Sequence, residues 1–382
     1  MKAIINGNIV TKDSVIRDGV ILFDEKIGQI GTDIPTGDAE LIDAKGAYVI
    51  PGLIDIHIHG YKGCDTSDGK KDDLLKIAAE LPKNGVTAWC PTTMTIPMNE
   101  VQAALDIIGE LKNKNKGAEI LGANVEGPFI NPTKKGAQDA QYIQKPNIEF
   151  VMNNQDKIKL LTLAPEQDDD NRFIKYISEH TDITLSVGHT DATYEQTHSA
   201  FMNGASHVTH LFNAMTPFSH RAVGVIGAAL SDDAVSCELI ADTFHVSPVL
   251  YKIVAKLKGN KLVLITDCMR AGGMPDGEYT LGGQPVTVKG VECRLHDGTI
   301  AGSILTLNRA VRNFMEHTQL PIYEVVNMAS LNPARVIGEE KVRGSLEVGK
   351  YADMVIVEPD MTVRQTLIRG ESQLNHSEVR SF

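Results

Sequence analysis

The stretch Pro51-Gly-Leu-Ile-Asp-Ile-His-Ile-His-Gly60 (PGLIDIHIHG) alternates isoleucines with side chains that bind protons. Successive side chains of a β-strand point to opposite faces, so Asp55, His57 and His59 share one face and the isoleucines share the other. Two imidazoles on one face of an apolar strand are costly to bury unless a partner compensates them. The pattern therefore predicts a buried strand with a polar ligand, such as a metal ion, on one side.

The middle of the chain repeats this kind of strand. Apolar runs alternate with amphipathic stretches whose apolar residues recur at i, i+3 and i+4, which is typical of strand–helix units. Eight such runs predict an α/β fold with a (β/α)8 barrel over residues 51–344. The runs are GLIDIHIH (52–59), GVTAWCPT (85–92), AEILGANVE (118–126), IKLLTLA (158–164), ITLSVGH (183–189), ASHVTH (205–210), SCELIAD (236–242) and KLVLITD (261–267).

Other segments complete this architecture. Residues 1–50 and 344–370 carry short β-like runs broken by Gly and Asp, which predicts a small β-sandwich domain built from both chain ends, 1–50 plus 345–382. The Gly-rich segment near 272–300 predicts a β-hairpin insertion after the eighth strand. Two helices over 306–317 and 322–338 are expected to close the barrel.

Four more strands end in residue types that bind metals. Glu126, His189, His210 and Asp267 close their runs, at the end of a barrel where active sites are built. Taken singly, each more often caps a helix or bonds a loop, but together with the His57/His59 pair they favour a shared metal site. Four imidazoles and two carboxylates exceed one tetrahedral ion and suit two divalent ions with a bridging carboxylate. Since bound Zn²⁺ lowers the pKa of water from 15.7 to about 7, the predicted reaction class is hydrolysis.

Composition excludes several other functions. A net charge of −12 argues against nucleic acid or an anionic membrane as a partner. The N-terminus lacks the apolar core of a signal peptide and no run approaches about 18 apolar residues, so a cytoplasmic location is expected. Five scattered cysteines without a CxxC pair indicate reduced, buried thiols. No GxxxxGK[ST], GxGxxG or GxSxG motif indicates a nucleotide cradle or a serine nucleophile.

Several longer motifs carry a family resemblance. PGLIDIHIHG, VEGPFINPTKKGAQ (125–138), SVGHTDAT (186–193), HLFNAM (210–215), IADTFHV (240–246) and GSLEVGKYADMVIVE (344–358) resemble the amidohydrolase superfamily. Within it they are similar to the N-acetylglucosamine-6-phosphate deacetylases, over essentially the whole chain. The resemblance implies hydrolysis of N-acetylglucosamine 6-phosphate to glucosamine 6-phosphate and acetate, by attack of a metal-bound hydroxide.

The resemblance also implies roles for the strand-end residues. Glu126, His189 and His210 would be the core metal ligands, and Asp267 the catalytic acid/base as well as a metal-site residue. Some family members lack the His57/His59 pair and work with one ion, so keeping it implies two divalent ions. Nitrogen and oxygen ligands of this kind leave zinc and iron both open.

Substrate contacts are implied in the same way. Asn213, Ala214 and His245 would hold the sugar phosphate, and Arg221 in PFSHRAVG would reach the phosphate of a neighbouring subunit, which implies a homodimer. Gln138 departs from the commonest family pattern, in which a histidine helps to polarise the substrate carbonyl. A glutamine amide can donate a hydrogen bond there but carries no charge.

Three alternatives remain open on the sequence. The first is deacetylation of another amino sugar phosphate, such as the galactosamine epimer, which no residue excludes. The second is a cyclic amide hydrolase; those enzymes typically bridge their ions with a modified lysine, whereas Glu126 is the candidate bridge here. A non-catalytic barrel relative is the least favoured, because all six metal-binding or catalytic positions are kept.

Overall fold

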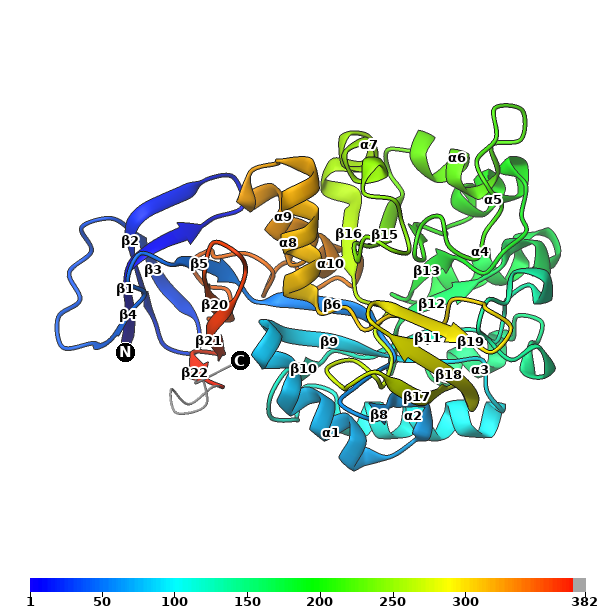
Figure 1. Ribbon diagram of the computed structural model, residues 1–382, viewed down its shortest axis with the longest axis horizontal. Coiled ribbons are helices and arrows are strands. Elements are labelled where there is room, and N and C mark those ends of the chain that lie inside the picture. The colour runs from blue at the N-terminus through cyan, green and yellow to red at the C-terminus, as the bar shows by residue number, and fades with distance from the viewer. Residues whose placement is uncertain (374–382) are drawn as a thin grey trace.

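A ring of parallel strands forms the centre of the computed structural model, which describes residues 1–373 (Figure 1). Neighbouring strands pair in parallel from β6 through β9 and on to β16. The ring closes between β16 and β6, where Asp267 N–H donates to the His57 carbonyl at 2.9 Å and His59 N–H to the Cys268 carbonyl at 2.9 Å. The predicted eight-stranded barrel is confirmed, with its third run divided into β10 (Glu119–Ile120) and β11 (Ala123–Glu126), which both pair with β9. The other barrel strands are β6 (Leu53–Ile58), β9 (Val86–Thr93), β12 (Ile158–Leu163), β13 (Thr184–Val187), β14 (His207–Val208), β15 (Ser236–Ile240) and β16 (Leu262–Ile265).

Helices surround the ring, each burying an apolar face against the strands. In α4, for example, Phe173, Ile174 and Ile177 are buried at the i, i+1 and i+4 positions. The helices are α1 (Lys71–Glu80), α2 (Met98–Leu111), α3 (Ile148–Met152), α4 (Arg172–His180), α5 (Tyr194–Met202), α6 (Gly224–Ser231), α7 (Val249–Lys258), α8 (Leu307–Thr318), α9 (Ile322–Met328) and α10 (Leu331–Val336).

Two sequence-based expectations about these elements were incomplete. The stretch 322–338 is two helices, because the backbone leaves helical geometry at Ser330, whose hydroxyl donates to the Val326 carbonyl at 2.8 Å. The insertion near 272–300 is a three-stranded antiparallel sheet, β17 (Gly277–Leu281), β18 (Gln284–Lys289) and β19 (Glu292–Leu295), where a hairpin was expected. This sheet lies against the barrel loops, since the Gln284 amide donates to the Ala137 carbonyl.

Both chain ends form one mixed sheet beside the barrel, at the left of Figure 1. Strand β5 pairs antiparallel with β20, which joins the N-terminal strands to the C-terminal ones. The sheet has its own hydrophobic core, which includes Ile4, Ile21, Val49 and Met354. Its strands are β1 (Lys2–Val10), β2 (Val15–Phe23), β3 (Ile27–Gly31), β4 (Glu40–Asp43), β5 (Tyr48–Pro51), β20 (Met354–Val357), β21 (Val363–Ile368) and β22 (Glu371–Ser372).

A β-domain from both ends is thereby confirmed. The limits 1–50 plus 345–382 and 51–344 stay predictions, and residues 374–382 of the expected β-domain lie outside the described residues. Within residues 1–373, no helix combines the length and apolar character needed to cross a membrane.

A buried ionic cluster joins the two parts. Arg343 and Arg369 each donate to the Glu119 carboxylate, at 3.0 and 2.9 Å, and Glu119 belongs to barrel strand β10 while Arg369 follows β21. The Arg369 guanidinium also stacks 4.0 Å from the ring centre of Tyr351. Glu119 and Arg343 are both nearly inaccessible to solvent. Because Arg369 of the β-domain bonds Glu119 of the barrel, this cluster holds the β-domain against the barrel at β10.

Candidate metal centre and active site

The six predicted metal-site residues meet at one end of the barrel. His57 lies in β6 and His59 just after it, Glu126 ends β11, and the other three follow β13, β14 and β16 by two residues. All six are at most 9% exposed. His189, His210 and Asp267 have positive φ angles of 47°, 28° and 49°, an uncommon conformation for residues other than glycine that often marks functional sites.

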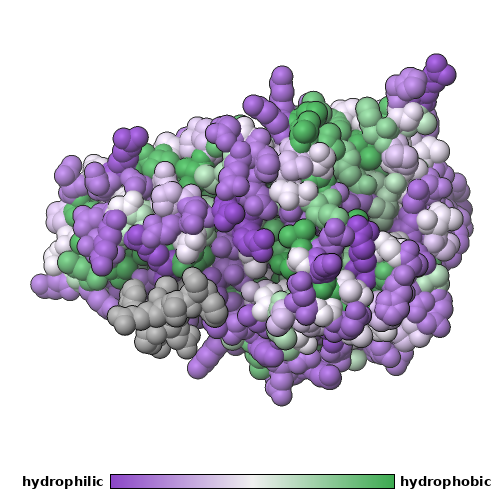
Figure 2. Space-filling view, viewed as in Figure 1, coloured by the Kyte–Doolittle hydropathy of each residue, from purple (hydrophilic) through white to green (hydrophobic). Residues whose placement is uncertain are grey.

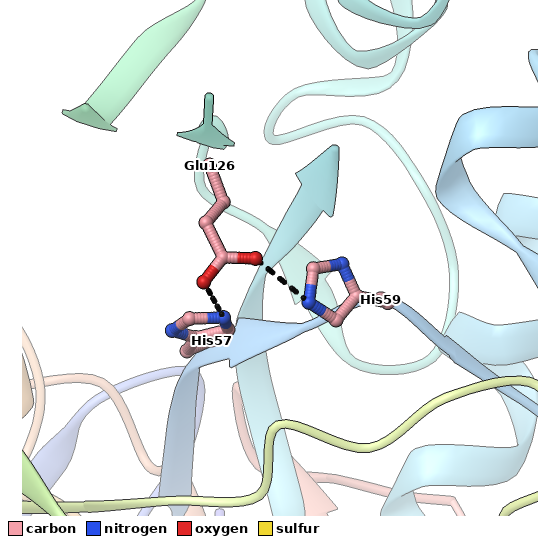
Figure 3. A group of neighbouring side chains, drawn as sticks. All are labelled: His57, His59 and Glu126. Atoms are coloured by element: carbon pink, nitrogen blue, oxygen red, sulfur yellow. Dashed lines mark ion pairs between the residues drawn. The ribbon is translucent and has the colours of Figure 1, made fainter. Parts of the chain in front are cut away.

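The side chains form two groups that share Glu126. His57 Nε2 lies 3.4 Å from Glu126 Oε1, and His59 Nε2 lies 3.2 Å from Oε2 (Figure 3). In the second group, His189 and His210 place their Nε2 atoms 3.2 and 2.9 Å from Oε1 of the same Glu126 carboxylate. Each group keeps its ligand atoms within 4.8 Å of one another, a spacing that can hold an ion.

Asp267 faces the first group. Its Oδ1 lies 3.2 Å from His59 Nε2 and 3.6 Å from His57 Nε2. Its carboxylate also lines a cavity at this end of the barrel, so it lies between the predicted ligands and that cavity.

The donor set fits divalent metal ions. Imidazole nitrogens and carboxylate oxygens are common ligands of zinc and iron. Nε2 of His57 is fully buried and makes no well-formed hydrogen bond among residues 1–373, although a buried ring nitrogen normally finds a partner. An ion between His57, His59 and Glu126 would supply that partner.

Charge in the site favours a cation. Burial alone would raise the pKa of Glu126, but the facing imidazoles of His57, His189 and His210 hold that pKa well below its usual range. Burial lowers the pKa of His59, yet hydrogen bonds with Asp267 and Glu126 outweigh it and raise the pKa to about 9. The carboxylates thus stay ionised, and a divalent ion would compete with protons for the imidazoles.

Two further acidic residues lie deeper in the barrel, and sequence reasoning missed the role of both. Glu238, in the middle of β15, accepts from His57 Nδ1 at 2.9 Å. His207 in β14 places Nε2 3.3 Å from the same carboxylate. Asp55 shares the face of the two histidines but accepts from the Thr266 hydroxyl at 2.6 Å, so it supports the neighbouring strand β16.

A cavity of about 300 Å³ opens above the metal-binding groups. His245, Asn213 and Ala214 line it, and so does Leu281 of the inserted sheet. His245 Nδ1 lies 2.6 Å from the Asp242 carboxylate, so that its Nε2 is left for a ligand. His59, Glu126, His189, His210, Asp267 and Gln138 also line this cavity.

Gln138 and Arg221 are placed differently from the other predicted contacts. The Gln138 amide is held on both sides: Nε2 donates to Glu126 Oε2 at 2.8 Å, and Oε1 accepts from Thr95 N–H at 2.6 Å. One amide hydrogen remains for a substrate. Arg221 lies on an exposed loop and does not line the cavity of its own chain.

Comparison with known proteins gives the family. The amidohydrolase family model matches residues 48–372. The chain belongs to this family. The resemblance to its N-acetylglucosamine-6-phosphate deacetylases is confirmed: the chain is 41% identical to the deacetylase of that name from Bacillus subtilis, over 95% of this chain and 94% of the relative.

Other members extend the comparison. An N-acetylgalactosamine-6-phosphate deacetylase from Escherichia coli O157:H7 is 37% identical over 93% of each chain. The crystal structure of N-acetylglucosamine-6-phosphate deacetylase from Pasteurella multocida superposes with a TM-score of 0.92 at 32% identity, covering 98% of this chain and 100% of that one. A mutant of the Mycobacterium smegmatis enzyme, solved in complex with N-acetyl-D-glucosamine-6-phosphate, gives 0.91 at 29% identity, covering 98% and 99%.

Proposed function

We propose that this protein hydrolyses N-acetylglucosamine 6-phosphate to glucosamine 6-phosphate and acetate, using two divalent ions, zinc or iron. The observation that carries the proposal is the pair of buried ligand groups sharing Glu126 beneath a cavity of about 300 Å³. Ions held there would make bound water acidic near neutral pH and polarise a carbonyl oxygen. His57 and His59 would serve the first group, and His189 and His210 the second.

Asp267 acts as the acid/base. Its carboxylate lines the cavity beside His59, and hydrogen bonds from His59 keep its pKa low although burial acts to raise it. An ionised carboxylate accepts a proton from the attacking water and then delivers it to the departing amine nitrogen. Gln138 contributes its remaining amide hydrogen to the substrate, with the rest of the amide held by Glu126 and Thr95.

The phosphate is held by other residues that line the cavity. His245 offers Nε2 and Ala214 offers its backbone N–H, while Asn213 lines the cavity beside them with its amide donating to the His210 carbonyl at 3.2 Å. Arg221 reaches the cavity of the neighbouring subunit in a homodimer, where a guanidinium pairs well with phosphate oxygens.

Exposed apolar side chains support the dimer. Val249, Ile253 and Leu257 form a stripe at i, i+4 and i+8 on α7 and are 76%, 48% and 48% exposed. Phe218, on the same loop as Arg221, is 59% exposed. A hydrophobic patch is visible at the top of Figure 2 over α7, and such a patch is typical of an interface.

The cytoplasmic location of the protein stays a prediction.

Acetate release tests the substrate. Purified protein loaded with metal is given N-acetylglucosamine 6-phosphate, its galactosamine epimer and unphosphorylated N-acetylglucosamine, with an Asp267→Asn variant as control. We expect fast release from the glucosamine phosphate alone. A preference for the epimer favours the second candidate, which the relative from Escherichia coli O157:H7 keeps in view. No release from any sugar, with ions bound, overturns the assignment and points to cyclic amides.

A further inference from the structure

A buried carboxylate holds one of the histidine ligands from behind. Glu238 is 0% exposed and does not line the cavity. Its Oε2 accepts from His57 Nδ1 at 2.9 Å and from the backbone N–H of His210 at 3.0 Å, and its Oε1 lies 3.3 Å from His207 Nε2. His207 is itself held by Ser236, whose hydroxyl lies 2.6 Å from Nδ1.

This contact fixes which nitrogen of His57 can bind a metal. An ionised carboxylate only accepts hydrogen bonds, so the ring hydrogen of His57 must sit on Nδ1. The lone pair is then on Nε2, the atom that faces Glu126 in Figure 3. A carboxylate behind a ligand histidine also raises the basicity of the imidazole.

His57 is singled out among the four histidines. The Nδ1 atoms of His59 and His189 meet backbone carbonyls, of Thr92 at 3.2 Å and of Lys134 at 2.9 Å. His210 Nδ1 has no hydrogen-bond partner among residues 1–373, so within that range His57 is the one of the four with a side-chain carboxylate at Nδ1. Oε2 also accepts from His210, but from its backbone N–H and not from its ring, so the carboxylate orients the imidazole of the first group only.

Packing alone gives no reason for a carboxylate at this position. The neighbours of Glu238 in β15 are Cys237, Leu239 and Ile240, all fully buried. Burying an ionised group carries a desolvation penalty that an apolar residue of similar volume avoids. A role toward the metal site explains the residue better than stability does.

We propose that Glu238 is a positioning residue that enables ion binding at the group formed by His57, His59 and Glu126, and that His207 keeps its carboxylate in place. The inference rests on the two-ion site proposed above. It predicts that losing the carboxylate weakens one ion selectively and leaves the ion at Glu126, His189 and His210.

Metal content tests this without relying on turnover. Wild type, Glu238→Gln and Glu119→Gln are dialysed, counted for bound metal and titrated against a competing chelator. Glu119→Gln is a matched control, because it makes the same change to another buried barrel carboxylate, one that bonds Arg343 and Arg369. We expect two ions in wild type and in the control, and in Glu238→Gln one ion bound as in wild type and the other about 10- to 100-fold more weakly.

The outcomes separate the two proposals. Two ions bound with wild-type affinity in Glu238→Gln overturn the positioning role and leave the two-ion site standing, and so does equal weakening of both ions. A single ion in wild type overturns the two-ion site and the inference with it. Should Glu238→Gln not fold, NMR of the wild type labelled with ¹⁵N-histidine decides: a protected Nδ1 proton that disappears in His57→Gln supports the inference, and its absence overturns it.

Discussion

Removing the first ligand group should cost most of the turnover. The change is the double variant His57→Gln and His59→Asn, which leaves Glu126, His189 and His210 in place. Loss of stabilisation of a developing oxyanion costs about 3–4 kcal/mol. Gln138 is the neighbouring donor, but its amide is held by Glu126 and Thr95, and its one free hydrogen already serves the substrate in the wild type, so it supplies no new compensation. The loss of about 3–4 kcal/mol corresponds to a kcat lower by about 150- to 900-fold.

Initial rates of acetate release at saturating substrate measure this change, with bound metal counted on the same samples. His198→Asn serves as a control, because His198 is an exposed histidine on α5. We expect one ion and slow turnover in the double variant, and two ions and normal turnover in the control. A near-normal kcat with a single ion would refute the reasoning, since Gln138 or another neutral group would then suffice to polarise the carbonyl.

Three other predictions concern the dimer, the ions and the domain contact. Arg221→Met and Asp267→Asn should each be nearly inactive alone. A co-expressed mixture of the two should recover about a quarter of the wild-type activity, because half of the randomly formed dimers are mixed and each mixed dimer holds one complete site of two. If the mixture recovers no activity, an arginine acting across the dimer interface is contradicted. Chelation should lower the unfolding temperature, since an ion present at about 100 times its Kd contributes about 2.7 kcal/mol to stability; an unchanged temperature in a calorimetric scan opposes tight binding. Arg343→Met leaves part of the buried Glu119 charge unpaired and should cost about 3 kcal/mol of unfolding free energy in denaturant titrations; a loss below about 1 kcal/mol would show that Arg369 compensates alone.

The meeting of the candidate metal-site residues was predictable because the barrel converts sequence position into spatial position. The carboxyl ends of parallel barrel strands converge on one face, so polar residues at the ends of apolar runs must approach one another. The convergence of Glu126, His189 and Asp267 could therefore be predicted without any knowledge of helix packing, and their metal-binding and catalytic roles stay predictions. Helix boundaries lacked such a constraint: α6 (Gly224–Ser231) contains two glycines that weaken its helical signal, and the helix expected over 322–338 ends early at Ser330.

The contacts behind the ligands were not predictable in the same way. Glu238 and His57 are 181 residues apart, and their contact depends on the curvature of the whole ring, which no local pattern encodes. Gln138 likewise looked free to meet a substrate until the structure showed its amide engaged on both sides. A sign nevertheless existed in SCELIAD: an ionisable residue in the middle of a buried strand needs a partner inside the barrel, and the nearest unsatisfied groups there are the ligand histidines. In the sequence, candidate ligands can therefore be recognised at the ends of the strands. The residues that orient them can be recognised as charged residues in the middle of buried strands.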